Sequence, residues 1–74
     1  MNDMQRYEKL AEAAYDAMYR AAPPLAKMHY EDAAANFTKA IAAARKAGAQ
    51  DEAVRLTARL DHIRAVYDSQ FLGL

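Results

Sequence analysis

The sequence predicts an all-α fold in which three helices form an up-down-up bundle. Alanine, the best helix former because its side chain loses no entropy on ordering, provides 19 of the 74 residues. Residues that interrupt helices are rare, since the whole chain has two glycines and two prolines. Apolar residues also recur at steps of three and four, which is the spacing of one helix face. We therefore expect a single helical domain over residues 1–74.

A first helix is predicted over residues 3–21. Asn2 or Asp3 can cap its N-terminus, and Gln5 follows Asn2 at the spacing of a capping box. Its apolar residues keep the steps of three and four that place side chains on one face. This face is expected to comprise Met4, Tyr7, Ala11, Ala14, Met18 and Ala21.

A second helix is predicted over residues 24–47. Pro23 ends the preceding helix, whereas Pro24 suits the first turn of a new one, where its missing N–H group is not needed. The pattern leaves open whether this helix is continuous or interrupted near His29. Gly48 follows its last turn, as a left-handed C-terminal cap requires. The apolar face is expected to comprise Tyr30, Ala33, Ala34, Phe37, Ala40, Ile41 and Ala44.

A third helix is predicted over residues 51–71, with Asp51 as its N-cap. The connections between the three helices are short, so consecutive helices are expected to be antiparallel neighbours. The first and third helices then run parallel to each other. The apolar face of the third helix is expected to comprise Ala53, Leu56, Leu60, Ile63, Tyr67 and, at the last step, Phe71 or Gln70.

The segment from residue 30 to 41 resembles the second helix of a tetratricopeptide repeat (TPR). In that family, an alanine is followed four residues later by a large aromatic residue and three residues after that by another alanine. Ala33, Phe37 and Ala40 have this spacing. Residues 44–67 resemble the passage into the first helix of the next repeat.

The family pattern does not extend to the segment before this match. Ala17, Arg20, Ala21 and Pro24 occupy the positions that belong to the preceding helix of a repeat, and of these residues only Ala21 fits the pattern. A chain of 74 residues is also too short for three repeats of about 34 residues. The resemblance, over residues 30–67, therefore implies a TPR-like helix hairpin within the bundle, and it implies a protein-binding role.

Composition excludes several classes of function. Ten basic and ten acidic side chains give zero net charge, which argues against affinity that depends on nucleic-acid phosphates or anionic lipid. The absence of cysteine excludes disulfides, thiolate metal sites and cysteine nucleophiles. No apolar run approaches the roughly 18 residues that a membrane span needs. The N-terminus lacks the pattern of a secretory signal, so we expect a cytoplasmic protein without a membrane partner.

The residues that are capable of chemistry do not form a recognisable site. His29 and His62 lack the spacing that directs two ligands from one helix face to a metal, so surface or rim positions are expected for both. Glu8, Glu12 and Asp16 share one side of the first helix without a nucleophile nearby, which is typical of a solvated or salt-bridged face. We expect no enzyme activity, no metal, no cofactor and no small-molecule substrate.

Stripes of opposite charge mark the first and third helices. Glu8 and Glu12 lie on one flank of the first helix, and Arg55 and Arg59 lie on one flank of the third. Because these helices are expected to run parallel, the stripes can pair within one bundle. The same complementarity can instead join two chains.

Two of the five tyrosines lie outside the predicted apolar faces. Tyr15 and Tyr19 stand beside the acidic stripe of the first helix. Either the second helix or the C-terminal tail, Phe71-Leu72-Gly73-Leu74, covers these rings, or the rings anchor a partner protein. The sequence alone leaves both alternatives open.

The favoured hypothesis is a small non-enzymatic protein–protein interaction module. It is expected to act as an adaptor or regulatory subunit that forms a homodimer or docks on a protein partner. Below roughly 70–80 residues, one core seldom provides more than about 3–5 kcal/mol of stability without a disulfide or metal. The alternative is a nucleic-acid-associated regulator that uses basic residues of the second and third helices, namely Arg45, Lys46, Arg55 and Arg59. The predicted partner-contact residues are Tyr15, Tyr19 and Phe71, with Glu12 and Arg59 as rim charges.

Overall fold

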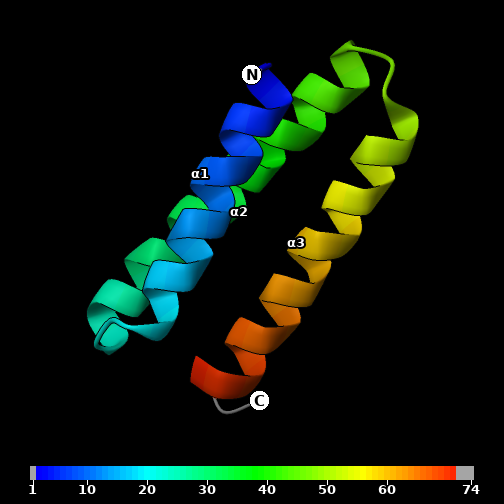
Figure 1. Ribbon diagram of the computed structural model, residues 1–74. Coiled ribbons are helices and arrows are strands. Elements are labelled where there is room, and N and C mark those ends of the chain that lie inside the picture. The colour runs from blue at the N-terminus through cyan, green and yellow to red at the C-terminus, as the bar shows by residue number, and fades with distance from the viewer. Residues whose placement is uncertain (1, 72–74) are drawn as a thin grey trace.

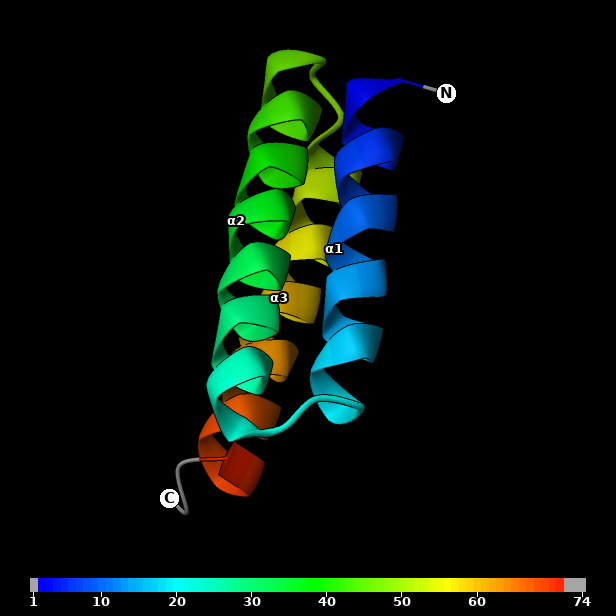
Figure 2. The same cartoon turned by 90° about the vertical axis from the view of Figure 1, so that its left-hand side faces the viewer.

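Three helices in an up-down-up arrangement make up the protein (Figures 1 and 2). The computed structural model describes residues 2–71, in which α1 spans Asp3–Tyr19, α2 spans Pro23–Lys46 and α3 spans Gln50–Phe71. Within these residues there is no β-strand. The prediction of an all-α three-helix bundle is confirmed.

Helix α1 begins with the predicted capping box. The Gln5 backbone N–H donates to Asn2 Oδ1 at 2.8 Å, and the Asn2 N–H donates to Gln5 Oε1 at 3.3 Å. The helix ends at Tyr19, two residues before the predicted end. The reason is Pro23, which forces the preceding residue, Ala22, into an extended conformation (φ −67°, ψ 157°), so the chain must leave the helix before it.

Helix α2 is continuous over 24 residues, so no interruption occurs near His29. It begins at Pro23, one residue earlier than predicted, because two consecutive prolines both fit the first turn, where no backbone donor is needed. It ends at Lys46 instead of Ala47. Gly48 follows with φ +74°, as a left-handed cap requires, and this conformation is one that residues with a Cβ rarely adopt.

Helix α3 begins at Gln50, one residue before the predicted start. The Ala53 N–H donates to the Ala49 carbonyl at 3.0 Å, so the first helical turn already includes Gln50. Asp51 is therefore not the N-cap. It lies within the first turn together with Glu52, where negative charge is favourable at the positive end of the helix dipole.

The core is small and follows the predicted apolar faces. Its largest fully buried side chains are Phe37, Met18, Leu56 and Ile63. A main cluster joins all three helices, and a smaller cluster of Met18, Ala26 and Tyr67 lies toward the α1–α2 turn. No polar or charged side chain is buried in the described part of the chain. The alanines of the predicted α2 face at positions 33, 40 and 44 are fully buried.

The central helix is α2, which packs along both of its neighbours. The backbones of α1 and α3 come close at few points, and Figure 1 shows α1 in front of α2 with α3 to the right of both. The resulting arrangement is flat, with Cα dimensions of 37 × 22 × 12 Å. The space between α1 and α3 is therefore bridged mainly by long side chains, and these form the candidate site.

Candidate partner-binding seam between helices α1 and α3

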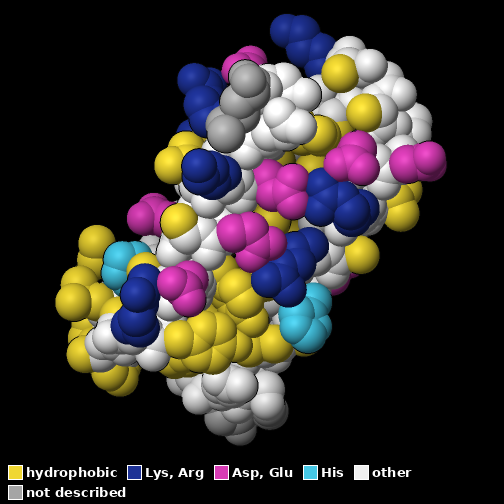
Figure 3. Space-filling model, in the orientation of Figure 1, with side chains coloured by type: hydrophobic (Ala, Val, Ile, Leu, Met, Phe, Trp, Pro, Cys, Tyr) yellow, Lys and Arg dark blue, Asp and Glu magenta, His cyan; other side chains and the backbone are white. Residues whose placement is uncertain are grey.

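Two parallel ion pairs connect α1 to α3. The Arg55 guanidinium donates to both carboxylate oxygens of Glu8 at 2.7 and 2.9 Å, and Arg59 does the same to Glu12 at 2.9 and 2.8 Å. The two glutamates are four residues apart in α1, and the two arginines are four residues apart in α3. The two parallel helices therefore form both ion pairs in the same register. Figure 3 shows these opposite charges meeting in the middle of the face. The predicted complementarity is thus satisfied within one bundle.

Paired charge also changes the ionisation of these groups. The hydrogen bonds from Arg55 lower the pKa of the Glu8 carboxyl below its usual value, although partial burial opposes this shift. The hydrogen bonds of Glu8 and then Glu52 raise the pKa of Arg55, and the hydrogen bond of Glu12 raises that of Arg59. The ionised form of each group is therefore favoured in the folded protein.

Tyr15 continues the row beyond the second ion pair. The Arg59 guanidinium carbon lies 5.1 Å from the centre of the Tyr15 ring, which is a cation–π distance. The Tyr15 and Tyr19 hydroxyl groups share a hydrogen bond of 2.9 Å, and their rings meet edge to face at 5.3 Å. Burial, followed by the hydrogen bond with Tyr19, raises the pKa of Tyr15 to about 12.

Phe71 completes the row from the end of α3. Its ring lies 6.3 Å from that of Tyr19 at an angle of 60°. On its other side it stacks on Tyr67 at 5.4 Å, and Tyr67 stacks on Tyr30 of α2 at 3.9 Å. We call the row formed by Glu8, Glu12, Tyr15, Tyr19, Arg55, Arg59 and Phe71 the α1–α3 seam.

All five residues predicted to contact a partner belong to the α1–α3 seam. Tyr15 contacts Arg59, Glu12 pairs with Arg59, and Tyr19 contacts Phe71. Glu8 and Arg55 also belong to the seam but were not predicted as contact residues, although both lie in the charged stripes that the sequence shows. Tyr30 and Tyr67 were predicted to lie on the apolar faces, but their stacking on each other was not predicted. This stacking depends on the relative positions of α2 and α3. The tail residues Leu72, Gly73 and Leu74 lie outside the described part of the chain.

The seam is accessible at its aromatic end. Tyr19 is 47% exposed, and two other large apolar residues near the α1–α2 turn, Leu25 and Met28, are 52% and 58% exposed. Figure 3 shows hydrophobic side chains gathered at this end of the molecule. Leu10 of α1 and Val54 of α3 are also exposed, but they lie elsewhere along their helices. Three of the five exposed large apolar residues in the described part of the chain therefore lie around one turn.

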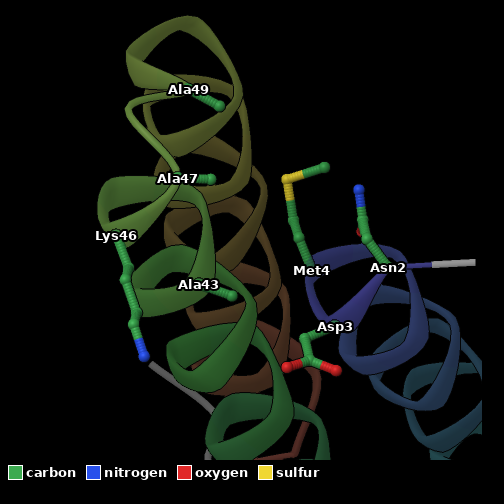
Figure 4. A pocket seen from close by; sticks show the side chains of 7 residues that line it. All are labelled: Asn2, Asp3, Met4, Ala43, Lys46, Ala47 and Ala49. Carbon is green, nitrogen blue, oxygen red and sulfur yellow. The ribbon is translucent and has the colours of Figure 1, made fainter.

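The structure places the histidines, the acidic residues and one pocket as follows. Among residues 2–71, no three His, Cys, Asp or Glu side chains group closely enough to hold a metal ion. His62 is exposed and His29 is half-buried. A pocket of about 280 Å³ lies between the N-terminus of α1 and the end of α2, and its side chains (Figure 4) include one carboxylate, Asp3, and one ammonium group, Lys46. The walls of this pocket are otherwise mainly alanine and methionine.

The basic residues of α3 and the apolar character of the helices relate to two other classes of partner, nucleic acid and membrane. Arg55 and Arg59, two of the four basic residues on which the nucleic-acid hypothesis depends, are each engaged by a glutamate of α1. In the described part of the chain, none of the helices combines the length and apolar character that crossing a membrane requires. Accessible apolar and aromatic surface is therefore the more prominent feature of the molecule.

Comparison with known proteins adds no family assignment. No protein-family model matches the chain, no curated protein matches it, and no solved structure matches it. The TPR-like pattern therefore remains a prediction from the sequence, and the functional argument depends on the residues of the seam and of the α1–α2 turn.

Proposed function

We propose that this protein is a small non-enzymatic protein–protein interaction module, an adaptor or regulatory subunit that forms a homodimer or docks on a protein partner. The observation that carries this proposal is the accessible aromatic end of the α1–α3 seam. There Tyr19 is 47% exposed, and two more apolar residues at the same end of the molecule, Leu25 and Met28, are also exposed. Exposed aromatic side chains near aliphatic ones commonly anchor protein interfaces. The proposed contact residues remain Tyr15, Tyr19 and Phe71, with Glu12 and Arg59 at the rim.

The small core supports the same function. A domain of this size gains only about 3–5 kcal/mol from one core, and natural domains of this size add a disulfide, a metal or a second chain. The sequence has no cysteine, and the described residues hold no group of metal ligands. Burial of the exposed apolar side chains against another chain is the remaining source of stability. We place this protein in the cytoplasm, without a cofactor.

The TPR resemblance supports a scaffold role. Ala33, Phe37 and Ala40, the three residues that carry the family spacing on α2, are all fully buried. Such burial suits a helix that is approached closely on both sides, as in a TPR hairpin. TPR proteins bind other proteins, so the resemblance favours interaction over catalysis.

The test measures self-association by native mass spectrometry and light scattering over a range of concentrations. The protein with Tyr15→Ala and Tyr19→Ala is compared with the wild type, and Val54→Ala serves as the control because Val54 is 69% exposed but lies outside the seam. We expect a dimer for the wild type and for the control, with an affinity at least about tenfold lower for the double variant. The proposal would be contradicted if the wild type stayed monomeric in both measurements and the tyrosine substitutions left its self-association unchanged.

A further inference from the structure

Helix α2 has one long face that points away from both of its neighbours. Ala26 and Ala44 are fully buried, and each lies nine residues, or about two and a half helical turns, from Ala35. The side of α2 that is centred on Ala35 is therefore opposite the core, and Ala35 itself is exposed. Figure 2 shows α2 at one side of the molecule, with α1 beside it and α3 behind. We call this side the outer face of α2, and its exposed residues are Met28, Glu31, Asp32, Ala35, Thr38, Lys39 and Ala42.

The charges of the outer face are separated by sign along the helix. The acids Glu31 and Asp32 lie about one turn before the centre of the face, and the base Lys39 lies about one turn after it. Among residues 2–71, none of these three side chains forms an ion pair. The Lys39 ammonium lies 5.6 Å from the centre of the Tyr7 ring, near the outer limit of a cation–π contact, and Lys39 is exposed. The three charges can therefore pair with a second molecule.

We propose that the outer faces of α2 from two copies of this chain bind each other, with the two helices antiparallel about a two-fold axis at Ala35. Such an axis places the residue four positions before Ala35 in one copy opposite the residue four positions after it in the other. Glu31 of one copy therefore faces Lys39 of the second copy, and Asp32 lies beside the same lysine. The symmetry repeats these opposite charges on the other side of the axis. A parallel alignment would place like charges beside each other, so the charges select the antiparallel one.

The side-chain sizes along the centre of the outer face fit the same arrangement. Ala35 meets its symmetry mate at the axis, and Met28, seven positions before it, faces Ala42, seven positions after it. Alanine lets two helices approach to about 8 Å, the lower end of interaxial distances. Met28 is 58% exposed, and the contact removes part of this apolar surface from water. Lys27 and Arg45 lie at the edge of the face, where water and salt screen their like charges.

This contact goes beyond the proposed function because it uses a different side of the molecule. The outer face of α2 points away from the α1–α3 seam, so Tyr15, Tyr19 and Phe71 take no part in it. Its charges are exposed, and exposed ion pairs contribute little free energy. The contact is therefore the weaker of the two, and it joins dimers formed at the seam into tetramers as the protein concentration rises.

The test mixes two charge-reversed chains that both carry Tyr15→Ala and Tyr19→Ala, which remove the proposed contact at the seam. One chain adds Glu31→Lys and Asp32→Lys, and the other adds Lys39→Glu, so each chain alone has like charges across the outer face. In the mixture, native mass spectrometry should show heterodimers at least about tenfold above either homodimer. A higher salt concentration should reduce this excess. A chain with all three charge substitutions regains opposite charges across the face and should form homodimers again.

The matched control replaces Lys39→Glu with Lys9→Glu, which makes the same change of net charge at an exposed position of α1. An equal excess of heterodimer with this control would show that net charge alone joins the chains, and it would overturn the contact. A first mixture without heterodimers at every concentration, with all variants folded by circular dichroism, would also overturn it and leave the proposed function standing. If the mixture pairs as expected while the tyrosine substitutions do not change self-association of the wild type, the outer-face contact is supported and the proposed role of the seam is contradicted.

Discussion

Helix α1 meets its two neighbours through different kinds of side chain. Toward α2 it packs closely, with small and apolar residues such as Ala11 and Met18 that are fully buried. Toward α3 it is farther away, and long charged and aromatic side chains such as Glu12 and Tyr15 cross the space. The first interface excludes water, whereas Arg59 and Glu12 in the second keep 36% and 38% of their side-chain area exposed.

The two interfaces of α1 differ in what they contribute: one contributes to the stability of the fold and the other to the relative alignment of the helices. Close packing of small side chains depends on volume, so the α1–α2 interface should tolerate little change in size. Ion pairs at a solvent-exposed seam contribute little free energy because water screens them. Their bidentate geometry nevertheless selects one register between two parallel helices. The seam therefore specifies how α3 aligns with α1, whereas the α1–α2 interface maintains the fold.

The largest effect is expected from a change of volume in the buried part of α2. Ala40 is fully buried, whereas Ala35 on the same helix is exposed. Ala40→Leu inserts a larger side chain into a packed core and should destabilise the fold by about 1–3 kcal/mol. Ala35→Leu should change the stability by less than about 0.5 kcal/mol. Urea unfolding followed by circular dichroism measures both, and equal effects would show that α2 is not closely packed.

A smaller effect is expected from the second ion pair of the seam. A double-mutant cycle with Glu12→Gln and Arg59→Gln should give a coupling free energy of at most about 1 kcal/mol. The coupling should decrease as the salt concentration rises, because ions screen exposed charges. A coupling of several kcal/mol would mean that the seam, and not the α1–α2 interface, determines stability.

The smallest effect is expected from the pH dependence of the first ion pair. Because Arg55 lowers the pKa of Glu8 in the folded protein, ionised Glu8 contributes stability above the pKa of an unfolded glutamate, about 4.3. This contribution is lost as the pH falls through the lowered pKa. Glu8→Gln should therefore have a flatter dependence of unfolding free energy on pH in the acidic range. Unfolding curves at several pH values measure the difference, and parallel profiles would exclude a role for this pair.

Much of the local structure could be predicted from the sequence because it depends on neighbouring residues. The capping box of Asn2 and Gln5 and the left-handed Gly48 follow from short-range hydrogen bonding and backbone sterics. The apolar faces of α2 and α3 follow from helical periodicity, and most of their residues are buried as predicted. The observed helix ends differ from the predicted ones by one or two residues. Consecutive prolines and a first turn without a side-chain cap allow a helix to start at several positions.

The sequence by itself determined that three helices form, which faces of them are apolar, and that α1 and α3 carry stripes of opposite charge. Only the tertiary structure decided that Glu8 meets Arg55 and Glu12 meets Arg59, since this register depends on how the helices are aligned along α2. It also decided that Tyr30, Tyr67 and Phe71 stack in a row. The periodicity of apolar residues is a property of a single helix. Contacts between helices depend on the distances between the helix axes, which are determined by the volumes of the buried side chains.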